Sequence, residues 1–259
     1  MFSDSPTALP AIATLLAIDT ATEYCAVALM RGGDVVQHDI VQHVEAVGQS
    51  HSTVLLPWIE TLLHEQHLRL SDCDAIAFGA GPGGFTGLRI ACGVAQGLAW
   101  GAEKPVIPVG NLAALAWLAA QESKDATQPQ RIACAIDARM QEVYWAVFDV
   151  DVRGNAVHEV VAPSLSAAHA LTEELRPYAP QVVAGNAFLE GTALTAQCLP
   201  QVRADARAIA VLAQQAWLRG EALPAAQARP LYVRDRVAQT IEERKRARTT
   251  TTTTAQPSI

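Results

Sequence analysis

The sequence lacks the features of a secreted, disulfide-bonded or membrane-spanning protein. Its five cysteines are odd in number and form no Cys-x-x-Cys pair, so they are typical of buried apolar thiols in a reducing compartment. No lysine or arginine precedes Arg31, so the basic start of a signal peptide is absent. No apolar run approaches the ~18 residues of a membrane span. We therefore expect a cytoplasmic protein that makes no membrane contact.

The familiar catalytic and cofactor signatures are also absent. The stretch Gly79–Gly84 lacks the Lys-Ser/Thr ending of a P-loop, and its glycines are not in register with a following acid as a dinucleotide-binding fingerprint requires. There is no Gly-x-Ser-x-Gly elbow, and no cysteine has a base partner. The closest histidines, His64 and His67, miss the i, i+4 spacing of a helical zinc pair. The sequence thus predicts no catalytic residue, no metal site and no cofactor of its own, although Asp137 and Glu142 are acids suited to acid–base chemistry.

Charged residues are few and unevenly distributed. They make up 17% of the chain, and 50% of the 259 residues are hydrophobic, which is enough to form one large core or two lobes. The net charge of −7 argues against binding nucleic acid alone, because such binding requires neutralised phosphates. The segment 229–248 is an exception, with seven basic and three acidic residues.

The pattern of apolar runs predicts an α/β protein of two lobes. Strands are predicted at Leu15–Asp19, Tyr24–Met30, Val35–Val41 and Ala75–Phe78, and helices at Ser52–His67 and Leu88–Trp100. A polar break at Glu122–Gln130 separates the lobes. We predict a flexible leader at 1–13, a first lobe at 14–121, a second lobe at 131–228 whose last helix can pack back on the first lobe, and a basic segment with a disordered threonine-rich tail at 229–259.

A short internal repeat favours two lobes of one design. Ala17-Ile18-Asp19 recurs 118 residues later as Ala135-Ile136-Asp137, and each copy leads into a second apolar strand and a turn. The stretch Val182–Asn186 then repeats the strand and glycine turn that precede a helix in the first lobe. Three elements recur in the same order, although matches this short also arise by chance.

The turn after the first strand has residue types found in phosphate sites. Asp19, Thr20 and Thr22 offer an acid and two hydroxyls that could hold a metal-bound phosphate. The same residues are common in ordinary turns. The second copy of the repeat has Ala138–Met140 in place of the threonines, so a phosphate clamp built from both lobes is incomplete.

A second turn is rich in glycine and lies between a strand and a helix. This arrangement directs free backbone N–H groups at an anion. Without a P-loop ending or a complete second lobe, we predict that both turns are vestigial phosphate-type turns. Their residues are Asp19, Thr20, Thr22, Gly81, Gly83 and Gly84.

Two predicted helices have wide apolar faces. Trp58 on the first is a residue type enriched at interface hot spots, and the glycines and alanines of the second allow another helix to approach closely. Either face could instead be covered by the sheet of its own lobe. We predict that a partner protein binds through Leu55, Trp58, Ile59, Leu62, Ile90, Gly93, Val94, Gly97 and Leu98.

Four segments together resemble the bacterial TsaB (YeaZ) family. They are LLAIDTATEYCAVAL (15–29), GPGGFTGLRIACGVAQGLA (81–99), AIDARMQEVYWAVF (135–148) and RPLYVRDRVA (229–238). The resemblance covers the chain well from Leu15 to about Gly110, and from Asp149 to Ala228 only in general character. It implies the two-lobe fold of the actin-like ATPase and sugar-kinase superfamily, with a duplicated mixed sheet and helices.

The resemblance also implies a role in tRNA modification. The family helps to make N6-threonylcarbamoyladenosine at position 37 of tRNAs that read codons beginning with adenine, as a non-catalytic scaffold or activator of TsaD. The implied partners are TsaD in a heterodimer, the ATPase TsaE, a second copy of the chain when TsaD is absent, and tRNA only through the complex. ATP or ADP and a metal are expected on the partner proteins. On this basis Arg244, Lys245 and Arg246 are predicted to contact tRNA.

One residue of the glycine turn departs from the family pattern. The family turn reads GPGSFTG, and Gly84 stands where serine is expected, which removes a hydroxyl but keeps the turn geometry. This departure favours a structural turn over a phosphate site. Two alternatives stay open at this point: an ATP-binding kinase or ATPase that uses Asp19 and Thr20, and a metal-dependent, glycoprotease-like peptidase.

Overall fold

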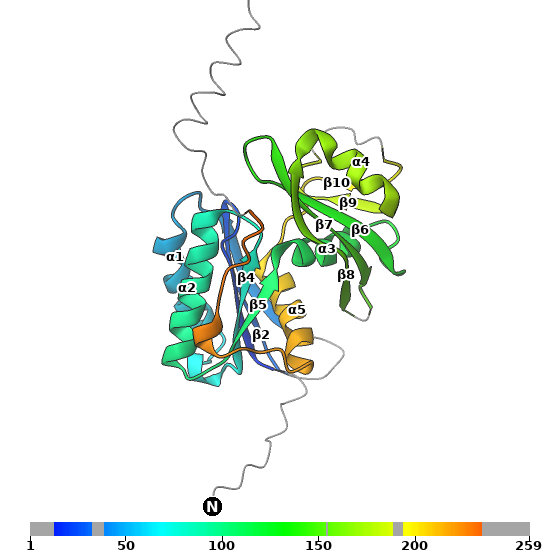
Figure 1. The fold of residues 1–259 in the computed structure, drawn as a ribbon. Coiled ribbons are helices and arrows are strands. Elements are labelled where there is room, and N and C mark those ends of the chain that lie inside the picture. Colours follow the sequence, from blue (N-terminus) through cyan, green and yellow to red (C-terminus); the bar gives the residue numbers. More distant parts are fainter. Residues whose placement is uncertain (1–12, 33–38, 154, 189–193, 235–259) are drawn as a thin grey trace, which may run out of the picture.

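The computed structural model describes residues 13–32, 39–153, 155–188 and 194–234, which form two lobes of mixed α/β structure (Figure 1). Each lobe contains one five-stranded sheet, with the order β3-β2-β1-β4-β5 in the first lobe and β10-β9-β6-β7-β8 in the second. The predicted class, an α/β protein with a duplicated mixed sheet, is confirmed.

The elements of the first half are β1 (Leu15–Asp19), β2 (Tyr24–Met30), β3 (Ile40–Ala46), α1 (His51–Glu65), β4 (Ala75–Gly81), α2 (Phe85–Gly101), β5 (Val106–Gly110) and α3 (Asn111–Glu122). Those of the second half are β6 (Gln130–Asp137), β7 (Glu142–Asp151), β8 (Ala156–Ala167), α4 (Leu171–Leu175), β9 (Val182–Ala184), β10 (Gln197–Leu199) and α5 (Ala206–Leu218). Short 3-10 turns lie at Leu70–Asp72, Ala168–Ala170, Arg176–Tyr178 and Ala225–Gln227.

The two sheets have the same topology. β1 pairs with β2 in antiparallel and with β4 in parallel orientation, and β6 pairs in the same way with β7 and β9. The second sheet, followed from β8 to β10, therefore repeats the order of the first from β3 to β5. Asp19 and Asp137 end the matching strands β1 and β6, so the repeat predicted from the Ala-Ile-Asp motif is confirmed.

The central strands of the first sheet are buried on both faces. Every residue of β1 and β4 is buried, as expected for parallel strands covered by helices on either side. Leu16 and Ile18 pack toward α1 and α2, whereas Leu15 and Ala17 pack on the other side, because successive side chains of a strand alternate. α5 covers that other side (Figure 1).

The last helix of each half packs on the sheet of the other half. α3 follows the first sheet in the chain but lies against β6 and β7, and α5 follows the second sheet but lies against β1 and β2. The two helices also contact each other, so one apolar core runs from the first sheet through α3 and α5 to the second. Each sheet therefore depends on a helix from the other half.

The third predicted strand is displaced in the structure. It was expected at Val35–Val41, of which residues 35–38 lie outside the described residues, and the strand that is described runs from Ile40 to Ala46. Its position follows from pairing with β2 along its whole length, with Ile40 opposite Met30 and Ala46 opposite Tyr24. The predicted end of this strand at Val41 was therefore wrong, and its predicted start lies outside the described residues.

One residue of the predicted leader belongs to the core. Ala13 is fully buried, and its N–H donates to the Oε1 atom of Gln214 over 3.0 Å. The rest of the predicted leader and the threonine-rich tail lie outside the described residues. Among the helices of the described ranges, none is long and apolar enough to cross a membrane.

Candidate functional site

The predicted phosphate-type turns line a cleft between the two lobes. The cleft has a volume of about 1120 Å³, and its walls come from the β1–β2 turn, the β4–α2 turn, the β6–β7 turn and residues 231–234. Both copies of the repeat therefore meet at one place. Which chemistry the cleft can support depends on where the polar groups of these turns point.

Asp19 belongs to the core beneath the cleft. Asn111, the first residue of α3, donates from its Nδ2 atom to Oδ1 of Asp19 over 2.8 Å. The Oδ1 atom of Asn111 accepts from the N–H of Gly81 over 2.7 Å. The N–H of Ala21 also donates to Asp19 Oδ1, over 3.2 Å. Asp19 is 2% exposed, and burial raises its pKa to about 6, with the Asn111 hydrogen bond opposing the rise. Asp19 thus ties β1, β4 and α3 together.

The two threonines are also occupied by internal hydrogen bonds. The Thr20 hydroxyl is fully buried and donates to the carbonyl oxygen of Gly87 over 2.7 Å, which fastens the β1–β2 turn to the first turn of α2. The Thr22 hydroxyl accepts from the N–H of Tyr24 over 3.1 Å, a local bond that shapes the turn itself. The Thr20 hydroxyl is therefore committed to the core, whereas Thr22 lines the cleft with its O–H still able to donate.

The glycine turn packs directly on the β1–β2 turn. The N–H of Gly84 donates to the carbonyl oxygen of Ala21 over 2.7 Å, so this donor is not available to an anion. A Cβ atom on Gly83 would lie 2.8 Å from the Cβ of Ala21, and one on Gly87 would overlap the carbonyl of Thr20. Close packing between the turns therefore accounts for two of the glycines.

The matching turn of the second lobe is more open. The N–H of Asp137 donates to Oδ1 of Asn186 over 2.8 Å, and Oδ1 of Asp137 accepts from the N–H of Arg139 over 2.8 Å. Arg139 Nη1 lies 3.4 Å from Oδ2 of Asp137 in an exposed ion pair. Gly185 directly after β9 has a φ of +108°, close to the +121° of Gly81 at the end of β4, so the strand-to-glycine turn is repeated as predicted.

Burial corrects the predicted partner interface on α1. Leu55, Ile59 and Leu62 are 1%, 3% and 6% exposed, because they pack on the first sheet and form part of its core. Their side chains are therefore used by the core of the lobe and leave little surface for a partner. Trp58 is half-buried and packs on the ring of His43, with ring centroids 4.1 Å apart, so it keeps an accessible edge.

The predicted interface residues on α2 have a different environment. Ile90, Val94 and Leu98 are half-buried, whereas Gly93 and Gly97 are exposed. A Cβ atom added at either glycine would meet no atom within 4 Å, so this side of α2 is open. An incoming helix could approach its backbone closely.

Two exposed apolar residues of the outer helices were missing from the predicted interface. Trp100 is 67% exposed on α2, and Leu56 is 50% exposed on α1. Trp100 continues the spacing of Gly93 and Gly97 at i+7, so helical periodicity could have identified it. The open face of the two helices, hereafter the outer helix face, therefore consists of Leu56 on α1 and Ile90, Gly93, Val94, Gly97, Leu98 and Trp100 on α2. Trp58 lies about 200° around α1 from Leu56 and packs toward β3, so it does not belong to this face.

The basic segment after residue 228 is partly used inside the molecule. The N–H of Leu231 donates to the carbonyl oxygen of Ala80 over 2.7 Å, and Arg234 Nη2 lies 2.6 Å from Oε2 of Glu142. Glu142, considered above as an acid–base candidate, is thus engaged in an ion pair. Sequence reasoning did not find these contacts, because their partners are far away in the chain. The predicted tRNA contacts Arg244, Lys245 and Arg246 lie outside the described residues.

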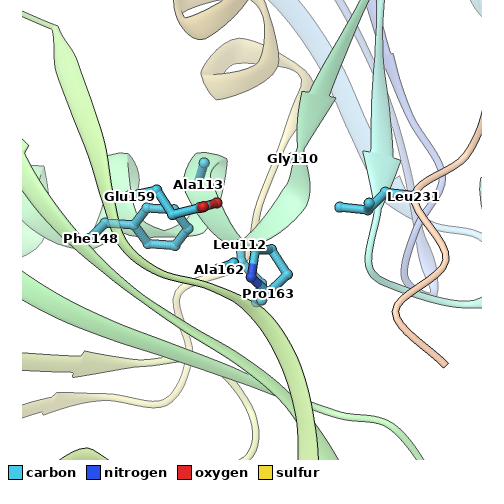
Figure 2. Close-up of a pocket in the computed structure, with 8 residues that line it drawn as sticks. All are labelled: Gly110, Leu112, Ala113, Phe148, Glu159, Ala162, Pro163 and Leu231. Atoms are coloured by element: carbon cyan, nitrogen blue, oxygen red, sulfur yellow. The ribbon is translucent and has the colours of Figure 1, made fainter.

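A smaller pocket of about 470 Å³ lies between α3, the second sheet and Leu231. Figure 2 shows Phe148 and Glu159 close together on one side and Leu231 on the other. Its walls are apolar apart from Glu159, so it offers no set of catalytic groups. Within the described ranges, no three His, Cys, Asp or Glu side chains are grouped to hold a metal ion.

Fold and site together define a class of protein: two lobes built from a duplicated sheet, with a phosphate-type turn closed by its own packing and an open pair of outer helices. The family model "TsaD: tRNA N6-adenosine threonylcarbamoyltransferase" matches residues 43–187, more than half of the chain. The structure of "YeaZ from Pseudomonas aeruginosa" is 36% identical and superposes with a TM-score of 0.73, covering 85% of this chain and 100% of that one. The chain belongs to the TsaB (YeaZ) family, and its match to the TsaD model fits a paralogue of TsaD.

Curated relatives agree with this assignment. The chain is 46% identical over 134 residues to the tRNA threonylcarbamoyladenosine biosynthesis protein TsaB of Haemophilus influenzae, covering 51% of this chain and 52% of that protein. It is 46% identical over 140 residues to TsaB of Escherichia coli, covering 54% of this chain and 57% of that protein. The chain thus spans about half the length of the curated relatives it matches.

Proposed function

We propose that this chain is a non-catalytic scaffold or activator subunit in the synthesis of N6-threonylcarbamoyladenosine on tRNA, and that it acts by binding TsaD. The observation that carries the proposal is the outer helix face. There, Gly93 and Gly97 leave the backbone of α2 open next to the exposed side chain of Trp100. Relatives named for this biosynthesis and the match to the TsaD model support the same pathway.

The chemistry of the outer helix face suits a helical partner. Half-buried Val94 and Leu98 supply apolar surface beside the two glycines, and Trp100 is a residue type that often dominates binding energy. Two helices can pack closely where small residues leave room, and dispersion contacts then accumulate over the whole contact. We propose that TsaD occupies this face in the complex and that a second copy of the chain occupies it when TsaD is absent.

The packing of the first-lobe turns supports a subunit without its own catalysis. Asp19 is 2% exposed and bonded to Asn111, and the buried Thr20 hydroxyl bonds to Gly87, so these two polar groups are already used inside the molecule. We accordingly place ATP or ADP and the catalytic metal on TsaD and TsaE. The kinase and peptidase alternatives would need groups that these contacts already use or a metal cluster that the described residues do not form.

Gly97→Glu tests the proposed docking face. A Cβ atom at this position meets nothing within 4 Å, and replacing a helical glycine adds about 0.5–1 kcal/mol of helix stability, so the variant should fold. A charge buried in an apolar contact costs about 3–5 kcal/mol, so affinity for TsaD should fall by about 100-fold or more. Co-purification with TsaD and TsaE, followed by a tRNA modification assay, measures the result.

Leu218→Glu is the matched control, because Leu218 is exposed on α5 at the other side of the first sheet. It should retain TsaD binding and modification activity. Equal binding by both variants would refute the docking face. Modification at full rate without this chain would refute the proposed function itself. Hydrolysis of ATP by the isolated chain, lost in Asp19→Ala, would restore the kinase alternative.

We also propose that Arg244, Lys245 and Arg246 contact tRNA once TsaD has bound it. Their joint replacement by alanine should weaken tRNA binding by the complex and flatten its salt dependence by about 0.7–0.9 log units per lost phosphate contact. Titrations of tRNA at several salt concentrations measure the slope, with Arg219→Ala, an exposed arginine paired with Glu221, as the control. An unchanged slope would remove these residues from the tRNA site.

A further inference from the structure

We propose that residues 229–234, hereafter the C-terminal strap, bind both lobes at once and so limit how far the cleft between the lobes can open. The side chain of Arg234 makes the contact to the second lobe on which this limit depends. The strap contacts both lobes beside the cleft and contributes residues 231–234 to its lining. It is anchored in both lobes by contacts between groups far apart in the sequence. This inference concerns the isolated chain, so it stands or falls independently of the proposed function.

The first anchor lies on the glycine turn of the first lobe. The N–H of Leu231 donates to the carbonyl oxygen of Ala80 over 2.7 Å. The carbonyl oxygen of Leu231 would lie 2.8 Å from a Cβ atom at Gly81, whose φ of +121° also favours glycine. The strap therefore rests directly on the backbone of the turn, and a larger residue at Gly81 would push it away.

A ring and an arginine strengthen the first anchor. The rings of Tyr232 and Phe85 lie 5.7 Å apart, and the Nε atom of Arg89 donates to the Tyr232 hydroxyl over 3.0 Å. The Arg89 guanidinium also lies over the Phe85 ring, 3.9 Å from its centroid. Phe85 and Arg89 belong to the first turns of α2, so the strap is fixed to the same helix that carries the outer helix face.

The second anchor lies on the β6–β7 turn of the second lobe. The Nη2 atom of Arg234 donates to the carbonyl oxygen of Ala138 over 2.9 Å and pairs with Oε2 of Glu142 at 2.6 Å. The Arg234 side chain is only 13% exposed, and its guanidinium lies 6.0 Å from the centroid of the Tyr144 ring. The Glu142 side chain is 38% exposed, so the ion pair is partly buried. Its loss would leave the shielded Arg234 charge without its partner.

The short chain segment between the two anchors limits how far the lobes can separate at the cleft. Leu231 and Arg234 are three residues apart, so even a fully extended chain joins them over about 10 Å. The lobes are already joined beneath the cleft by the core around α3 and α5. Opening the mouth of the cleft therefore requires one of the two anchors to break, and the side-chain anchor at Arg234 is the one that a substitution can release.

Arg234→Ala and Glu142→Ala test the ion pair that anchors the strap to the second lobe. Spin labels on Gln49→Cys and Glu173→Cys, both exposed, report the distance between the lobes in a Cys198→Ser background, because the other cysteines are buried. We expect one narrow distance distribution for the unaltered chain and a broader, longer one for both variants. Hydrogen exchange at the Leu231 amide should become at least tenfold faster in both.

Arg131→Ala is the matched control. Arg131 forms a two-pronged ion pair with Asp149, at 2.8 and 2.9 Å, but both residues lie on neighbouring strands of the second sheet. Losing this pair should leave the distance between the lobes unchanged. If Arg234→Ala fails to fold, Glu142→Ala decides the matter alone. The proposal would be overturned if a folded Arg234→Ala or Glu142→Ala variant kept both the spin-label distance distribution and the hydrogen-exchange rate of the Leu231 amide unchanged.

Discussion

Asp19, Thr20 and Asn111 form a small polar network inside an otherwise apolar lobe. Asn111 satisfies Asp19 and the Gly81 N–H at once, and Thr20 satisfies a carbonyl at the start of α2. Buried polar groups are tolerated where each finds a partner, and such networks hold neighbouring elements in one arrangement. At the scale of single residues, groups suited to phosphate chemistry therefore serve to join β1, β4, α2 and α3.

Replacing Asp19 by asparagine should remove a pH dependence of stability. The pKa of Asp19 is raised from 3.8 to about 6 by burial, so the folded state keeps a proton that the unfolded state has released. Stability of the unaltered chain should thus fall as the pH rises through this range and stay lower above it, by at most about 3 kcal/mol. Urea unfolding of both chains from about pH 4 to about pH 8 measures the effect.

Asp137→Asn is the control for this experiment, because Asp137 ends the matching strand of the second lobe and is exposed. That variant should keep the pH dependence of the unaltered chain. Asp19→Asn retains an oxygen that can accept from Asn111 and Ala21, so it should fold. An unchanged pH profile in Asp19→Asn would show that another group causes the dependence.

At the scale of elements, α2 has two sides with different tasks. Its first turn is fixed by the β1–β2 turn, where the Gly87 backbone touches Thr20. Its buried side, which includes Leu88, Ala91, Ala95 and Ala99, packs in the core, while Gly93 and Gly97 lie on the open side. The small residues of this helix therefore serve two structural purposes: some allow close packing in the core, and others leave the open side of the helix uncovered.

Gly87→Ala and Gly93→Ala should have opposite effects on stability. A Cβ atom on Gly87 would overlap the Thr20 carbonyl, and relieving such an overlap typically costs about 1–3 kcal/mol. A Cβ atom on Gly93 meets nothing within 4 Å, so this alanine should add about 0.5–1 kcal/mol through helix propensity. Urea unfolding compares the two variants, and equal effects would contradict the contact described at Gly87.

At the scale of the whole molecule, the exchange of α3 and α5 makes the two lobes one folding unit. α5 covers a face of the first sheet that includes the buried side chains of Leu15 and Met30, and α3 lies against the second sheet. A fragment ending before α5 would expose that apolar face to water. The lobes are therefore distinct in topology but share a core.

We expect the chain to unfold in a single cooperative transition, and the fragment 14–121 to fail to fold alone. Variants that keep only Trp58, in the first lobe, or only Trp145, in the second, report the two lobes separately by fluorescence. Their urea midpoints should coincide, because a shared core couples both sheets. Two separate midpoints, or a soluble fragment with native-like circular dichroism, would contradict the coupling.

The residues predicted for the interface are partly buried and partly exposed, and this difference shows what the sequence could and could not predict at the site. Apolar spacing identified α1 and α2 as helices with wide apolar faces, and the predicted interface included Gly93 and Gly97, which are exposed. It could not separate Leu55 or Ile59 from these, because a helix with apolar residues on much of its surface does not reveal which side meets the sheet. That choice depends on the position of the strands.

The sequence by itself determined most strands and helices of the first lobe, the repeat and the family, because these follow from local patterns of apolar residues and from short motifs. Only the tertiary structure decided the roles of the motifs. The strand-and-glycine turn before α2 packs closely against Asp19 and Ala21, which lie about 60 residues or more away in the chain. The basic segment became a strap through Glu142, 92 residues before Arg234. Long-range contacts of this kind arise from the balance of burial and hydrogen bonding over the whole chain, which no local pattern records.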